Sequence, residues 1–168
     1  MKRLINPSAR SKWNHIMNYR ALIFDDQKEI RQILWTLFDN RGYEVFTFPH
    51  PGLCPLSEAN ECPCPNNQAC SDIIVSDIDM PFKDGFAFVE EQIKKGCRCK
   101  HIALMSGTFT KEHYTKASSL GITIFKKPFR LSEIQHWLNQ IEKDIAPKRK
   151  LSDWFLKRIS LNEQNEEK

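Results

Sequence analysis

The stretch DIIVSDIDMPFKDG, residues 72–85, decides the fold of this chain. It begins with an apolar run at residues 73–75 that is rich in β-branched side chains. Such a short run between polar residues is typical of a strand buried on both faces of a parallel sheet. The strand ends in Asp77, and Pro81 with the turn at 83–85 then breaks the chain. A carboxylate is therefore expected at the carboxyl end of a central strand, where open parallel sheets bind ligands.

Three other apolar runs also end in residues that suit phosphate or metal chemistry. These are 21–24 followed by Asp25 and Asp26, 102–105 followed by Ser106 and Gly107, and 122–125 followed by Lys127 and Pro128. Three carboxylates at one sheet edge repel each other unless a cation neutralises them, and Mg²⁺ prefers such hard oxygen ligands. A carboxylate can also act as a nucleophile and form an acyl phosphate. Mg²⁺, the Lys127 ammonium and the Ser106 hydroxyl would then stabilise the phosphoryl oxygens.

Strands and helices are predicted to alternate through the chain. The expected strands are 19–24, 43–48, 73–77, 102–105 and 122–125, and the expected helices are 26–40, 86–96, 110–121 and 131–145. Asp26 with Glu29 and Ser132 with Gln135 have capping-box spacing, and Thr110 is a third candidate cap. This order predicts an α/β fold, a doubly wound parallel sheet with helices on both faces. The chain has no GxGxxG or Walker A motif, which argues against a nucleotide-binding fold.

Length and charge indicate one domain with two basic tails. The chain has 168 residues, and we expect a core domain at 19–146, a basic tail at 1–18 and a basic, amphipathic extension at 147–168. Although the net charge is +4, residues 21–146 carry fourteen basic and seventeen acidic side chains. A mildly acidic core argues against direct DNA binding. No apolar stretch approaches a membrane span or a signal peptide, so a cytoplasmic location is expected.

Together these motifs resemble the receiver domain of two-component response regulators. The matching residues are Asp25-Asp26, Asp77 with Met80-Pro81 and Asp84-Gly85, Ser106-Gly107 and Lys127-Pro128-Phe129. The resemblance covers about residues 19–145 and implies a flavodoxin-like sheet of strand order 2-1-3-4-5. It also implies that Asp77 accepts phosphate from a histidine kinase or phosphotransfer protein. The expected function is a stand-alone phosphorylation switch, not an enzyme, that signals to a downstream protein target.

The resemblance assigns further roles at the same edge. Asp25, Asp26, Asp77 and the backbone carbonyl of Asp79 would bind Mg²⁺. Ser106 and Lys127 would contact the phosphoryl group and bias a conformational switch. The family often has an aromatic residue three positions before the lysine, but this chain has Ile124 there and Phe125 after it. We place the candidate switch region at these two residues.

Residues 49–71 form a proline- and cysteine-rich insertion where the family usually has a short helix. The chain has six cysteines, namely Cys54, Cys62, Cys64, Cys70, Cys97 and Cys99. A cytosolic chain keeps its thiols reduced, which argues against a disulfide framework and leaves two alternatives. The thiols could bind zinc or an iron–sulfur cluster, which would order a loop with few apolar residues, or they could act as free redox sensors. Their spacing matches no standard zinc ribbon or finger.

Three further interpretations concern activity and the C-terminal extension. A receiver-like scaffold could sense metal or thiol redox state without phosphorylation. Asp77-Ile78-Asp79 also resembles the Asp-x-Asp motif of haloacid-dehalogenase-type phosphatases, a lower-ranked alternative because Pro81 and the early acidic pair depart from that family. The extension should form a short amphipathic helix, and we expect it to pack on the last helix of the core. The alternative is that it docks on a partner or a membrane surface.

Overall fold

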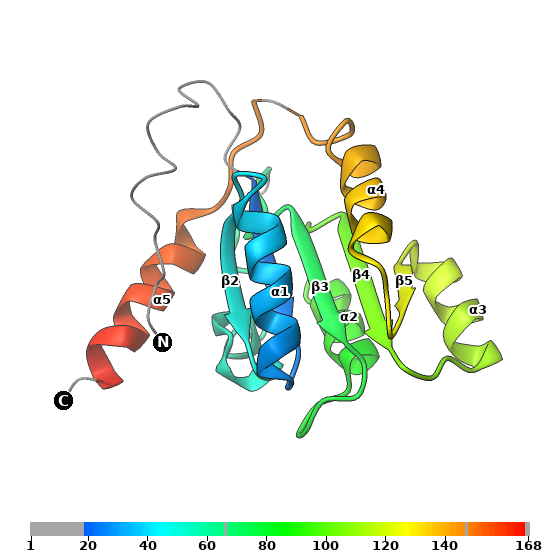
Figure 1. The fold of residues 1–168 in the computed structure, drawn as a ribbon. Coiled ribbons are helices and arrows are strands. Elements are labelled where there is room, and N and C mark those ends of the chain that lie inside the picture. The colour runs from blue at the N-terminus through cyan, green and yellow to red at the C-terminus, as the bar shows by residue number, and fades with distance from the viewer. Residues whose placement is uncertain (1–18, 66, 147, 167–168) are drawn as a thin grey trace.

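The computed structural model describes residues 19–65, 67–146 and 148–166, so the predicted N-terminal tail at 1–18 lies outside the described residues. Five parallel strands form one sheet in the order β2-β1-β3-β4-β5. The strands are β1 (Arg20–Phe24), β2 (Glu44–Phe48), β3 (Ile73–Asp77), β4 (His101–Ser106) and β5 (Thr123–Lys126). The predicted α/β class and the strand order 2-1-3-4-5 are confirmed. Because all strands run the same way, their carboxyl ends meet at one edge, the lower edge in Figure 1.

Four of the helices pack on this sheet in two pairs, one pair on each face. Helices α1 (Lys28–Asp39) and α4 (Leu131–Ile141) pack on one face, and α2 (Gly85–Lys94) and α3 (Lys111–Leu120) pack on the other (Figure 1). Successive side chains of a strand point to opposite faces. Ile23 of β1 accordingly joins the core under α1 and α4, while Phe24 joins the core under α2. Burial on both faces explains why these strands read as continuous apolar runs.

Several predicted helix ends need correction. Helix α1 begins after Gln27, not at an Asp26 cap, because the Asp25 carboxylate accepts the Gln27 N–H at 2.9 Å. Helix α4 begins after Arg130, whose N–H donates to Glu133 at 2.8 Å, and it ends at Ile141 and not at residue 145. The Thr110 cap of α3 is confirmed, since its hydroxyl accepts the His113 N–H at 3.2 Å.

The insertion after β2 contains two short 3₁₀ turns, η2 (Pro51–Leu53) and η3 (Pro55–Ser57), and no α-helix in its described residues. The C-terminal helix α5 (Asp153–Glu166) lies beside β2 (Figure 1). Its Phe155 is fully buried in the core shared with α2, with its ring edge on Phe46 of β2 at a centroid distance of 5.1 Å. The expectation that this helix packs on α4 is therefore wrong. It lies beside β2, next to the insertion, whose described residues form no α-helix.

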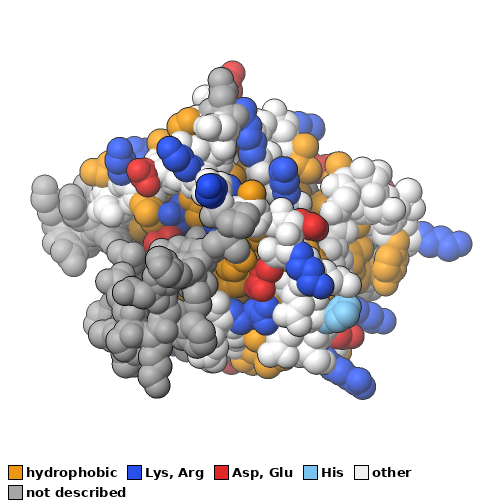
Figure 2. Space-filling view, turned by 90° about the horizontal axis from the view of Figure 1, so that it is seen from above, with side chains coloured by type: hydrophobic (Ala, Val, Ile, Leu, Met, Phe, Trp, Pro, Cys, Tyr) orange, Lys and Arg blue, Asp and Glu red, His pale blue; other side chains and the backbone are white. Residues whose placement is uncertain are grey.

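Charge and hydropathy add two points about the surface. Basic side chains are dispersed among acidic and apolar ones on the face shown in Figure 2, and they form no continuous stripe there. Within the described residues, no helix combines the length and the apolar character that crossing a bilayer requires.

Candidate functional site

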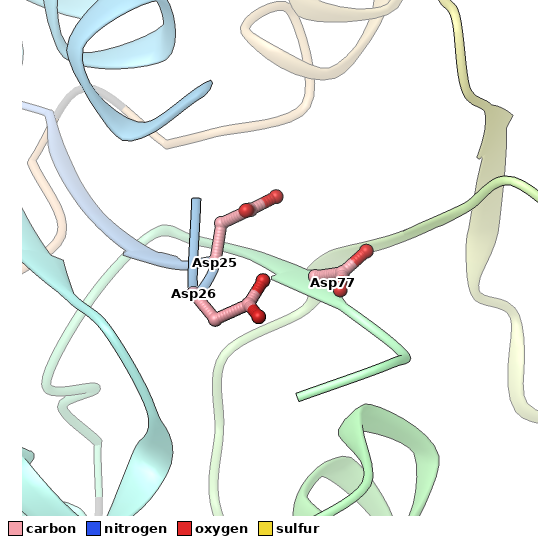
Figure 3. A group of neighbouring side chains, drawn as sticks. All are labelled: Asp25, Asp26 and Asp77. Carbon is pink, nitrogen blue, oxygen red and sulfur yellow. The ribbon is translucent and has the colours of Figure 1, made fainter. Parts of the chain in front are cut away.

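Three carboxylates meet at the carboxyl edge of the sheet. Asp25 and Asp26 directly follow β1, and Asp77 is the last residue of the adjacent strand β3. One carboxylate oxygen from each lies within 4.8 Å of the other two, and no other such group of metal-binding side chains occurs among the described residues (Figure 3). Asp25 and Asp77 are buried, whereas Asp26 is exposed. The edge therefore combines two buried acids with one that solvent reaches.

Lys127 supplies the positive charge of this site. Its Nζ lies 2.7 Å from Asp25 Oδ2 and 2.8 Å from Asp77 Oδ1. The lysine directly follows β5, so three strand ends position the three partners. Lys126, the last residue of β5, is exposed. Lys127, the lysine named in the sequence analysis, is therefore the one that contacts the carboxylates.

Burial and the contact between Asp77 and Lys127 shift the pKa of each group in opposite directions. Burial raises the pKa of the Asp77 carboxyl, the contacts with Lys127 oppose that rise, and the neighbouring carboxylates Asp25 and Asp79 add to it. For Lys127, burial acts to lower the pKa, but the hydrogen bonds to Asp25 and Asp77 outweigh it and raise the pKa. The site therefore holds a charged lysine beside an aspartate whose negative charge is costly.

This balance predicts a pH-dependent effect of Asp77→Asn on stability. A carboxyl whose pKa is raised by folding stabilises the protein when it is protonated, and this contribution is lost as the pH rises through the folded-state value. Without Mg²⁺, Asp77→Asn should therefore be more stable than wild type at about pH 7, with a smaller advantage at about pH 4. Urea unfolding at both pH values measures this, and an advantage that does not grow with pH would contradict the assignment.

Ser106 lies at the site but faces a partner that the sequence analysis did not expect. Its hydroxyl donates to Asp79 Oδ2 at 2.8 Å, and its Oγ accepts the Thr108 N–H at 3.0 Å. The sequence analysis assigned only the backbone carbonyl of Asp79, so the role of this side chain was missed. The sequence did contain a signal for this contact, namely the carboxylate of Asp79 two residues after Asp77. Ser106 would have to leave Asp79 to reach a phosphoryl group on Asp77.

The turn after β3 is shaped around Asp77. A Cβ at Gly85 would lie 2.1 Å from the Asp77 carbonyl oxygen, and the Gly85 N–H donates to the Ile78 carbonyl at 3.0 Å. Asp84 caps α2 by accepting the Ala87 N–H at 3.0 Å. Only glycine allows the start of α2 to approach the strand end so closely.

The candidate switch residues point to different faces of the sheet. Phe125 is buried against Trp137 of α4, with ring centroids 5.6 Å apart. Ile124 packs at the edge of the opposite core, the one that contains residues of α2 and α3. The aromatic side chain of β5 is thus fixed under α4, and the position beside α3 is aliphatic.

The structure brings four of the six cysteines together. Their side chains neighbour one another in a series, Cys62 with Cys64, Cys64 with Cys70 and Cys70 with Cys97. The other two lie apart from this series: Cys54 is buried within the insertion, and the Cys99 thiol lies 3.8 Å from the His101 carbonyl oxygen. All six are free thiols.

Comparison with known proteins agrees with this geometry. The model of the response regulator receiver domain family matches residues 21–139, so the chain belongs to this family of two-component signalling proteins. The chemotaxis protein CheY4 of Vibrio cholerae is 26% identical with a TM-score of 0.59, over 73% of this chain and 98% of that one. The receiver domain of the Francisella response regulator 1452 is 23% identical with a TM-score of 0.61, over 76% and 98%. No curated protein gives a significant match.

A third solved structure shows the fold alone. The response regulator receiver protein of Pseudomonas putida is 18% identical with a TM-score of 0.61, over 74% of this chain and 98% of that one. Receiver domains are in general phosphoacceptor switches and not enzymes, which argues against the phosphatase alternative. They typically bind Mg²⁺ at an acidic pocket such as the one formed by Asp25, Asp26 and Asp77.

Proposed function

We propose that Asp77 accepts a phosphoryl group from a histidine kinase or a phosphotransfer protein. The observation that carries the proposal is the placement of its carboxylate. It ends β3, is 3% exposed, and lies 2.8 Å from the Lys127 ammonium and beside the acidic pair of β1. An aspartate in that position can act as a nucleophile only if charge on the incoming phosphoryl oxygens is neutralised.

The transfer exchanges one bond for another. A carboxylate oxygen of Asp77 forms a bond to phosphorus, while the bond from phosphorus to the donor's histidine nitrogen breaks and its electron pair stays on nitrogen. The product is an acyl phosphate. Lys127, which already donates to Asp77, is placed to donate to a phosphoryl oxygen instead. Later hydrolysis of the acyl phosphate would restore the free carboxylate.

The acidic residues fit a bound Mg²⁺. Three carboxylates with one ammonium among them keep a net negative charge, and their oxygens are the hard ligands that Mg²⁺ prefers. Asp25, Asp26 and Asp77 would hold the ion, with the backbone carbonyl of Asp79 as a further ligand. When bound, Mg²⁺ supplies positive charge that stabilises the phosphoryl oxygens.

The response to phosphorylation would begin at Ser106. In this structure the Ser106 hydroxyl donates a hydrogen bond to the Asp79 carboxylate. A phosphoryl group on Asp77 would compete for this hydroxyl. Release from Asp79 would favour a second arrangement of the β4–α3 connection, so that phosphorylation shifts a conformational balance. A downstream protein would recognise the shifted surface. We expect no direct DNA contact, and we place the protein in the cytoplasm with its kinase.

Asp26→Asn should separate metal binding from folding. Asp26 is exposed, so we expect little change in stability without Mg²⁺. Mg²⁺ at about 100 times its Kd should stabilise wild type by about 2.7 kcal/mol, and this gain should largely disappear in the variant. Thermal unfolding with EDTA and with Mg²⁺ measures the gain, and phosphate incorporation from acetyl phosphate should fall with it. An undiminished Mg²⁺ response in Asp26→Asn would remove this residue from the site.

The second candidate is a receiver scaffold that senses metal or thiol redox state without phosphorylation. The specific observation in its favour is the series of four neighbouring thiols. This candidate predicts that the thiols bind a metal or change redox state, and that Asp77 takes up no phosphate.

A further inference from the structure

We propose that Cys62, Cys64, Cys70 and Cys97 bind one zinc ion, and that this ion fastens the C-terminal helix α5 to the sheet. The four residues are here called the thiol cluster. Three of them come from the insertion at 49–71, and Cys97 comes from the turn after α2. The proposal is independent of phosphorylation at Asp77.

Backbone hydrogen bonds bring these segments together. The Cys62 N–H donates to the Lys95 carbonyl at 2.8 Å, which joins the insertion to the end of α2. The Cys97 N–H donates to the Gln92 carbonyl at 2.9 Å, and Arg98 donates to the Pro65 carbonyl at 2.9 Å. Residues far apart in the chain are thus held with their thiols adjacent, as a binding site requires.

The middle of the insertion, residues 57–69, contributes no fully buried side chain to the core among its described residues. Fixing a residue's backbone costs about 1–2 kcal/mol, and apolar burial does not offset that cost here. Binding of Zn²⁺ by thiolates can supply such folding free energy, and four thiolates form a closed tetrahedral site.

Zinc binds cysteine as the thiolate, so binding would release the protons of these four free thiols. The four sulfurs form a series in which no three lie mutually within 4.8 Å, so zinc binding must draw the two ends of the series together.

The thiol cluster adjoins the start of α5. The Ser152 side chain neighbours Cys64, and the Ser152 N–H donates to the Ala69 carbonyl at 2.8 Å. Arg20 donates to the carbonyls of both Cys70 and Ser152, at 2.9 and 3.1 Å. A metal that orders Cys64 and Cys70 would therefore order the segment from which α5 begins. Its loss should loosen the helix that covers β2.

Metal analysis of the full chain, purified under reducing conditions and reloaded with Zn²⁺, tests the site. Wild type should hold about one zinc per chain. Cys64→Ser and Cys97→Ser should each weaken zinc binding more than about 100-fold, since loss of an outer-shell partner alone costs 10–100-fold. Cys54→Ala is the matched control, because Cys54 is a buried cysteine of the same insertion outside the thiol cluster, and it should retain zinc.

Hydrogen exchange gives a second readout, which measures the order of the segment before α5 and not the amount of bound metal. Chelation of zinc should speed exchange of the Ser152 and Trp154 amides in wild type and in Cys54→Ala, while amides of β4 stay protected. Absence of zinc in reloaded wild type, equal zinc in Cys64→Ser, or iron with sulfide in its place would overturn the proposal. A disulfide among these thiols in the purified protein, or α5 exchange unchanged by chelation, would overturn it as well.

Discussion

Gly85→Ala should destabilise the protein by about 3 kcal/mol or more, at or above the upper end for overpacking substitutions. The added Cβ would lie 2.1 Å from the Asp77 carbonyl oxygen, a backbone atom at the end of β3. No side-chain rotation relieves such a contact, so the start of α2 must move away from the strand. That movement would also disturb the Asp77 carboxylate, and we expect phosphate incorporation to fall together with stability.

Urea unfolding of Gly85→Ala beside Gly107→Ala measures this effect. Gly107 also lies at the site, but a Cβ there would meet nothing within 4 Å. We expect a change within about 1 kcal/mol for this control, as for ordinary open positions. Equal stability of the two variants would show that the approach of α2 to β3 is not as close as described.

Lys127→Ala should lower the free energy of unfolding by about 3–5 kcal/mol in EDTA, the usual cost of removing one partner of a buried ion pair. The substitution leaves Asp25, which is fully buried, and Asp77 without the ammonium that contacts both. The uncompensated charge should be partly neutralised by a metal ion. Mg²⁺ should therefore recover a larger part of the stability in this variant than it adds to wild type.

Lys126→Ala is the control for this experiment, because Lys126 is the exposed neighbour on β5. Its stability should stay within about 0.5 kcal/mol of wild type in both media. Denaturant unfolding of wild type and both variants, in EDTA and in Mg²⁺, measures these free energies of unfolding. If Lys127→Ala lost no more than Lys126→Ala, the central ion pair would contribute nothing to the fold.

The carboxyl edge could be predicted from the sequence because parallel strands share their carboxyl ends. Asp25, Asp77 and Lys127 each follow or end an apolar run, and that pattern is sufficient to bring them together. The start of α1 was mispredicted because the capping-box spacing of Asp26 and Glu29 does not include Asp25. The Asp25 carboxylate accepts the Gln27 N–H, and the helix begins only after Gln27.

The position of α5 could not be predicted from the sequence. Its amphipathic pattern shows that one side needs an apolar partner but does not identify that partner. The partner becomes apparent only when β2 is seen beside an insertion that forms no α-helix in its described residues. The same holds for the thiols: the sequence offered all six cysteines as candidate ligands, but Cys54 and Cys99 lie apart from the other four.

The most direct test of the proposed function is the intact mass of the protein after incubation with Mg²⁺ and acetyl phosphate, with wild type beside Asp77→Asn. We expect one phosphate adduct on wild type that hydroxylamine removes, as an acyl phosphate requires, and none on the variant. An equal adduct on Asp77→Asn would place the phosphate elsewhere. No adduct on either protein would contradict the phosphoacceptor role and favour the scaffold that senses through its thiols.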